Sequence, residues 1–236
     1  MEREQILGDE ARSRVPDEFV PQHRKIVNPP TFILVFEKMA KSILKEVSVQ
    51  VSPDGESIPA SSEELLFLEE SIPKLWKWLQ YIQTSQASKL DHGLKWFGRS
   101  EKHCFASGFD DTPRHSIVSE QESHVDLVAW MTYAYKTLST IELQLHGETP
   151  FYKELSSLAS TLHSELLSKY WDAESHCFGD LGVIAEDTVG FETHPSYISI
   201  LPFALMLMDE NDPRIAEILD LIEDPDKVFV ELFVEY

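Results

Sequence analysis

The predicted fold is decided by residues 119–143, which read SEQESHVDLVAWMTYAYKTLSTIEL. Apolar residues recur in this stretch with helical spacing, which predicts an amphipathic helix with one buried face. The residues that recur are Leu127, Met131, Ala134, Leu138 and Ile141. Ser119 and Glu122 have the spacing of a capping box, so Glu122 is predicted to close the helix N-terminus, to belong to a functional site, or to do both. Asp126 is expected one turn further on, on the same face as Glu122.

Helical spacing also occurs on both sides of this stretch, which predicts an all-α fold. Consecutive helices with short links pack as antiparallel hairpins, and no convincing strand pair is evident. The further predicted helices are residues 33–47, a helix capped by Ser61 that is kinked or divided at Pro73, one opening at Thr149-Pro150, the apolar run 197–208, and one starting at Asp212-Pro213. The final residues, VFVELFVEY, fit a strand or a helix equally well.

Charge narrows the class of ligand. The chain has 20 Lys and Arg residues against 41 Asp and Glu residues, a net charge of −21. Such a chain lacks the basic footprint of nucleic-acid-binding proteins, so no nucleic-acid partner is expected, and anionic membrane surfaces are disfavoured. A neutral ligand such as a carbohydrate, or a cationic ligand, remains open. The N-terminus is charged and is not a secretory signal, and no apolar window is long enough to cross a bilayer.

The cysteine and histidine residues do not indicate a metal or a disulfide framework. Cys104 and Cys177 are the only cysteines, and two buried thiols are favoured over one disulfide bond. His115 and His124 lie near acidic residues without a zinc or calcium spacing, so no metal is expected. No cofactor is expected either.

Residues 86–117 lack periodicity and are predicted to form a long loop, and long loops in compact domains are usually functional or disordered. The loop carries SGFDDTPR (residues 107–114), in which Asp110 and Asp111 are adjacent. Like-charge repulsion would keep Asp110 protonated and suit it to donate a proton. The alternative is a solvated turn, where Asp is favoured. Trp96, in the same loop, is a candidate for stacking against a sugar, whereas the other tryptophans are expected in the core.

Several motifs resemble those of glycoside hydrolase family 63, the processing α-glucosidase I family of mannosyl-oligosaccharide glucosidases. SGFDDTPR followed by Glu122, HVD (124–126) and Trp130 is similar to the family pattern SGLDDYPR…E-x-HVD…W. The other matching segments are REQILGDEARSRVP (3–16), NPPT (28–31), WFGR (96–99) and YISILP (197–202). The resemblance covers approximately residues 2–225 in order.

The resemblance implies a fold and an activity. The fold would be part of an (α/α) toroid of the six-hairpin glycosidase type, spanning residues 1–236. The activity would be removal of the terminal α-1,2-linked glucose from an N-linked oligosaccharide precursor, with inversion, in the endoplasmic reticulum. Family membership would make Asp110 the general acid, with Glu122 and Asp126 as essential supporting residues. The weaker sugar-contacting candidates are Asp111, Arg114, Arg3 and Glu4.

The chain also departs from the family pattern. Thr112 stands for the tyrosine of DDYPR, and Phe109 for the leucine of SGL. The family's membrane anchor, its N-terminal β-sandwich and the hairpins with the general-base glutamate have no counterpart in these residues. We therefore expect little or no turnover by this chain alone, and apolar helix faces exposed to solvent. The alternative function is that of a truncated or degenerate, non-catalytic helical protein that binds glycan weakly or contributes an interface.

Overall fold

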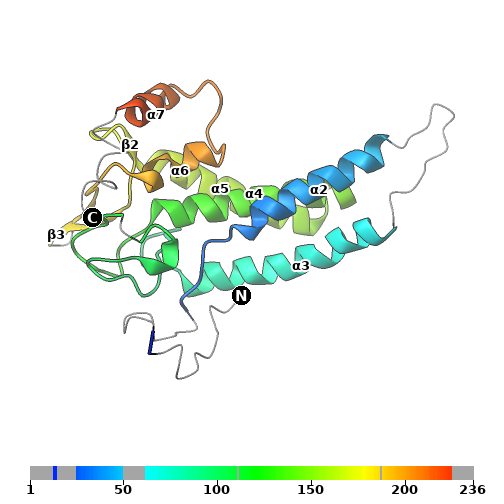
Figure 1. Cartoon of the computed structure of the whole chain (residues 1–236), viewed down its shortest axis with the longest axis horizontal. Coiled ribbons are helices and arrows are strands. Elements are labelled where there is room, and N and C mark those ends of the chain that lie inside the picture. The colour runs from blue at the N-terminus through cyan, green and yellow to red at the C-terminus, as the bar shows by residue number, and fades with distance from the viewer. Residues whose placement is uncertain (1–12, 15–24, 50–61, 111, 187, 225–236) are drawn as a thin grey trace.

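The computed structural model describes residues 13–14, 25–49, 62–110, 112–186 and 188–224. Helices dominate this part of the chain (Figure 1). Its helices are α2 (Phe32–Val49), α3 (Ser62–Ser85), α4 (Val125–His146), α5 (Pro150–Lys169), α6 (Tyr197–Ala204) and α7 (Arg214–Glu223), with the 3-10 helix η2 (Phe105–Ser107) between α3 and α4. The predicted all-α class is therefore correct in its main feature. No helix in these ranges is long and apolar enough to cross a membrane.

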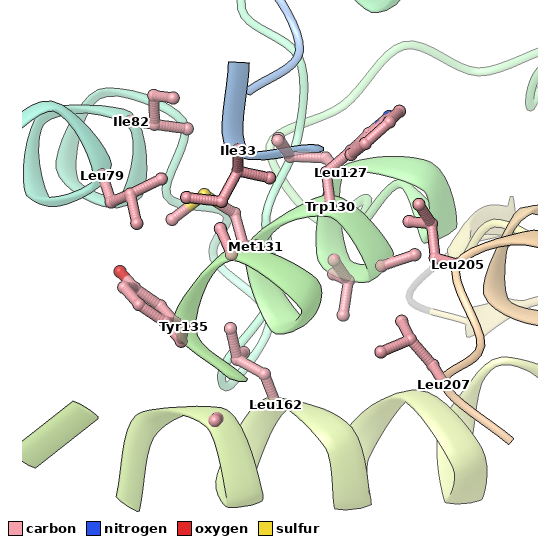
Figure 2. Packing of buried hydrophobic residues seen from close by; sticks show 14 of the residues in the cluster. Ile33, Leu79, Ile82, Leu127, Trp130, Met131, Tyr135, Leu162, Leu205 and Leu207 are labelled. Carbon is pink, nitrogen blue, oxygen red and sulfur yellow. The ribbon is translucent and has the colours of Figure 1, made fainter. Parts of the chain in front are cut away.

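Helix α4 is the centre of the molecule. It contacts α2, α3, α5 and α6, and Figure 2 shows side chains of α2, α3 and α5, and of the residues just after α6, converging on it. Met131 and Tyr135 of α4 lie between Leu79 of α3 and Leu162 of α5, and all four are buried (Figure 2). Burial therefore extends around most of the helix rather than along one face. A helix that is apolar over most of its circumference belongs in the interior.

The start of α4 differs from the prediction. The helix begins at Val125 and not near Ser119, because Ser123 pairs with Leu181 through two backbone hydrogen bonds of 2.7 and 2.9 Å and holds the chain extended. Ser119 instead accepts a hydrogen bond from the Gln121 N–H group in a local turn. The predicted capping box is therefore wrong. Glu122 lies outside the helix, so it shares no helical face with Asp126.

The other helices follow the sequence closely. Thr149 caps α5 by accepting the Tyr152 N–H group at 2.9 Å, with Pro150 at the first helical position. Helix α3 runs unbroken through Pro73, so it is not divided into two helices. Ser61 and the segment VFVELFVEY lie outside the described residues.

The absence of strand pairs was predicted wrongly. Strands β1 (Trp171–Asp172) and β2 (Cys177–Phe178) form one antiparallel pair, and β3 (Gly182–Ala185) and β4 (Thr188–Gly190) form another. Each strand is too short to show an alternating pattern in the sequence. The two hairpins lie between α5 and α6, at the same end of the molecule as the loop that precedes α4 (Figure 1).

Helices α2 and α3 leave apolar side chains exposed, as expected. The exposed fractions are 53% for Phe32, 58% for Val35, and 43% for both Met39 and Phe67. These side chains line a groove with a volume of about 410 Å³. The groove runs between α2 and α3.

Candidate active site

The loop between α3 and α4 is irregular but well tied to its surroundings. Gln86 holds its first part, because its side-chain oxygen accepts the Phe97 N–H group at 2.7 Å and its side-chain nitrogen donates to the Lys25 carbonyl at 2.6 Å. A backbone hydrogen bond from Lys95 to Gln86 adds to this. The prediction of a long loop over residues 86–117 is confirmed, and the loop extends to His124.

Residues 107–110, the first half of SGFDDTPR, form a compact turn that begins in η2. Gly108 has a φ of +74°, in the left-handed region that favours glycine. Ser107 donates its hydroxyl to the Cys104 carbonyl at 2.7 Å and accepts the Phe109 N–H group at 3.0 Å. Asp110 follows in a half-buried position, and its carbonyl accepts the Cys104 N–H group at 3.4 Å. The turn therefore fixes the backbone on which Asp110 stands.

Arg114, at the end of this segment, lies in the interior between two carboxylates. Its Nη1 and Nη2 atoms donate to Asp126 Oδ1 and Oδ2 at 3.0 and 2.9 Å, a bidentate pair. Nη1 also donates to Asp180 Oδ2 at 2.9 Å. All three side chains are buried. The loop, helix α4 and the β2–β3 link therefore meet at one guanidinium group.

Trp96 and His124 complete the surroundings of Asp126. The Trp96 indole N–H group donates to Asp126 Oδ2 at 2.9 Å. The Trp96 backbone N–H group donates to His124 Nδ1 at 2.9 Å, so a neutral His124 carries its proton on Nε2. Trp96 is only 1% exposed. The predicted stacking of its ring against a sugar does not fit this placement, and the indole instead holds a carboxylate.

Glu122 forms a second buried ion pair. Its Oε2 atom accepts Arg99 Nε at 2.9 Å and lies 2.8 Å from Arg99 Nη2. His124 Nε2 is 3.8 Å from the same oxygen. Arg99 Nη2 also donates to the His115 carbonyl at 2.6 Å, which ties the segment after Arg114 to the start of the loop.

The neighbouring arginines favour the ionised form of the Glu122 and Asp180 carboxyl groups. Burial opposes ionisation of Glu122, but the hydrogen bond and charge of Arg99 outweigh it and lower the pKa of Glu122. Burial likewise opposes ionisation of Asp180, whose pKa is lowered by Arg114 and by the hydrogen bond from the Val125 N–H group. Burial acts against the charged form of Arg114, yet Asp126 and Asp180 raise its pKa well above the ordinary value.

Neither cysteine is in a disulfide bond, and both thiols are buried, as predicted. Burial raises the pKa of Cys104 to about 11, although the charge of Arg114 acts in the opposite direction. A thiol of this kind is inert rather than nucleophilic. The parts of the chain that the structure describes contain no cluster of three or more His, Cys, Asp or Glu side chains arranged to hold a metal ion.

The structure brings some predicted site residues together and leaves others unplaced. Asp126 and Glu122 are 0% and 1% exposed, and both are neutralised by arginines that approach from the loop. Arg3, Glu4 and Asp111 lie outside the described residues. The segment that carries Asp110 is therefore tied at Arg114 to buried carboxylates, and these carboxylates are ion-paired in the interior.

Three contributors to this network were not predicted as site residues. Arg99 had a signal, because it ends the WFGR motif, and His124 stands within HVD. Asp180 had none, because it stands alone between two short strands far along the chain. Only the fold shows that it meets Arg114.

The part of the chain that the structure describes is mostly helical, and a long loop ahead of α4 carries the residues of the SGFDDTPR motif. The family model for the glycosyl hydrolase family 63 C-terminal domain matches residues 1–234. The chain therefore belongs to glycoside hydrolase family 63.

Relatives with assigned names are similar over nearly the whole chain. The chain is 31% identical to a probable mannosyl-oligosaccharide glucosidase of Schizosaccharomyces pombe, with 96% of this chain and 31% of the relative covered. It is 29% identical to the mannosyl-oligosaccharide glucosidase of Saccharomyces cerevisiae, with the same coverage. It is 32% identical to a mannosyl-oligosaccharide glucosidase of Arabidopsis thaliana, with 94% and 30% covered. The chain spans about a third of the length of these curated relatives.

Proposed function

We propose that this chain supplies the acid side of an inverting α-glucosidase site, which removes the terminal α-1,2-linked glucose from an N-linked oligosaccharide. One observation carries the proposal. The family's acid-bearing segment is present, and its Arg114 is held by buried ion pairs with Asp126 and Asp180. Protein rigidity beneath a reacting group is what precise positioning requires. The names of the relatives support an oligosaccharide substrate.

Asp110 is the general acid in this proposal. An inverting glycosidase needs one carboxylic acid to protonate the leaving oxygen and one carboxylate to activate water. Glu122 and Asp126 serve neither role directly, because arginine partners hold both as ion-paired carboxylates in the interior. They support the site by fixing Arg99 and Arg114. Asp111, Arg3 and Glu4 remain candidates for contact with the sugar.

The helical arrangement supports part of an (α/α) toroid. Helices α4 and α5 form an antiparallel hairpin joined by the short link 147–149. Helices α2 and α3 also run in opposite directions (Figure 1). Paired antiparallel helices are the repeating unit of such a toroid. The family resemblance further suggests the endoplasmic reticulum as the place of action.

The decisive test uses two substrates. We expect slow glucose release from a triglucosylated oligosaccharide, because only the acid half of the acid/base pair is assigned to these residues. Asp110→Asn should lower this rate by about 10²-fold or more, the usual contribution of general acid catalysis. Hydrolysis of α-glucosyl fluoride should be little affected, because fluoride leaves without a proton.

The matched control is Asp91→Asn, an exposed carboxylate in the same loop. This variant should hydrolyse both substrates at the rate of the unmodified chain. Equal oligosaccharide turnover by the Asp110→Asn variant and the unmodified chain would rule out Asp110 as the acid. NMR of the first product should show β-glucose, the anomer that inversion of an α-linkage produces.

A further inference from the structure

We infer that Asp180 is a positioning residue for the acid-bearing loop, which it holds through Arg114. The inference rests on the proposed function for its catalytic meaning, but the tether itself is a property of the fold. Asp180 lies in the link between β2 and β3 and is 5% exposed. A carboxylate in such a place is costly unless it is fully paired.

The backbone on both sides of Asp180 is fixed before its side chain makes any contact. The Gly179 N–H group donates to the Tyr170 carbonyl at 2.9 Å. Leu181 exchanges two backbone hydrogen bonds with Ser123, just before helix α4. The Tyr170 hydroxyl donates to Ser123 Oγ at 2.6 Å. The direction of the Asp180 side chain is therefore set by a hydrogen-bonded frame.

The two carboxylate oxygens of Asp180 accept hydrogen bonds from two different segments. Oδ1 accepts the Val125 N–H group at 2.8 Å, and so caps α4 from outside the helix, where the helix dipole favours a negative charge. Oδ2 accepts Arg114 Nη1 at 2.9 Å. One carboxylate therefore joins the start of the central helix to the end of the SGFDDTPR segment. His124, the N-cap residue, makes no side-chain capping bond of its own.

This second anchor limits how Arg114 can move. The bidentate pair with Asp126 holds the guanidinium group, but a single pair allows the plane to swing about that carboxylate. The bond from Nη1 to Asp180 approaches from a different segment and removes this freedom. Arg114 lies four residues after Asp110. Loss of the anchor should therefore be felt at the acid.

The test compares Asp180→Asn with Asp172→Asn in the full chain. The asparagine at position 180 keeps an acceptor for the Val125 N–H group but loses the charge that faces Arg114. Asp172 is a matched control, because it is also buried, in strand β1, yet it accepts the Glu174 N–H group within its own hairpin. Limited trypsin digestion then reports on the Arg114–His115 bond, with the Lys77–Trp78 bond in α3 as the reference for global unfolding.

We expect Asp180→Asn to raise cleavage after Arg114 by about ten-fold relative to cleavage after Lys77, because the loop opens locally. We also expect kcat to fall by about ten-fold or more with KM within about two-fold, since misplacement of a catalytic group costs rate rather than binding. Asp172→Asn should change neither.

The inference is overturned if cleavage after Arg114 is unchanged, if both sites open equally, or if Asp172→Asn gives the same result. Failure of the proposed function would be seen separately, as equal oligosaccharide turnover by the Asp110→Asn variant and the unmodified chain. The cleavage ratio does not depend on turnover and decides the tether by itself.

Discussion

Two regions of the molecule reverse the usual distribution of side chains in opposite ways. Around the loop before α4, Arg99 pairs with Glu122, and Arg114 pairs with Asp126 and Asp180, all of them buried. Between α2 and α3, phenylalanine, valine and methionine side chains are exposed to solvent around a groove. Helix α4 contacts both α2 and α3 and also carries Asp126.

The difference shows which interactions fix segments of the chain relative to one another and which mark a surface for contact. Buried ion pairs add little net stability, because removing charges from water offsets their attraction. Their geometry is nevertheless specific, and here it fixes three segments that are distant in the sequence. Exposed apolar side chains fix nothing by themselves, and a patch of this kind usually marks a contact surface.

The largest expected effect comes from removing the shared cation. Arg114→Leu leaves Asp126 and Asp180 buried without their positive partner, so the free energy of unfolding should fall by about 3–5 kcal/mol. Urea titration followed by circular dichroism would measure the loss. The control is Lys74→Met, which breaks an exposed pair with Glu70 and should cost at most about 1 kcal/mol. Similar losses in the two variants would show that the buried ion pairs contribute no more to stability than an exposed pair does.

Acid should destabilise the buried ion pairs of Asp180 and Glu122 around the loop before α4. The pKa values of Asp180 and Glu122 are lowered in the folded state, so their stabilising effect is complete above the unfolded values of about 3.9 and 4.3. It is lost as the pH falls through the lower folded values. The melting temperature should therefore hold steady down to about pH 5 and then fall steeply below about pH 4. In the Asp180→Asn variant the fall should be shallower, and an identical slope would contradict the assignment.

A smaller effect is expected from the indole of Trp96. Trp96→Phe keeps an aromatic ring but removes the N–H donor to Asp126, which should cost about 1–3 kcal/mol because a buried acceptor loses a partner. Thermal unfolding would measure it. Trp78→Phe, at the half-buried edge of the apolar groove, should cost less. The reverse order would favour simple packing over the hydrogen bond as the main role of Trp96.

The smallest effect on stability is expected at the exposed apolar groove between α2 and α3. Val35→Ala should change the free energy of unfolding by no more than about 0.5 kcal/mol, as is usual for surface positions. Binding of the dye ANS should fall, since the groove loses part of its apolar wall. Ile33→Ala, two residues earlier but fully buried, should cost about 2–5 kcal/mol. A large loss at Val35 would mean that this face is packed rather than open.

Much of the helical framework was predictable from the sequence. The apolar spacing after Pro30 and the Thr149-Pro150 start predicted α2 and α5, because periodicity and capping are local signals. The start of α4 was not predictable, since Ser123 is held extended by Leu181, a partner far along the chain. The strand pairs were missed for a related reason, because two to four residues carry no readable pattern.

The residues of the candidate site were predictable, but their burial and their hydrogen-bond partners were not. The motifs named Asp110, Glu122, Asp126 and Arg114 as residues of one site. They did not indicate that Glu122 and Asp126 lie in the interior, or that Trp96 holds Asp126 through its indole. Burial and hydrogen-bond partners depend on which segments meet, and local spacing carries no information about that.

The sequence by itself therefore determined the helical class and the acid-bearing segment, which depend on residues that are close together in the chain. It also determined the family, which depends on the order of motifs along the chain. Only the tertiary structure decided that Arg114 lies between Asp126 and Asp180. These residues come from the loop, from α4 and from the link between two short hairpins. A buried charge requires partners from whichever segments pack around it, and that requirement is met in space rather than along the sequence.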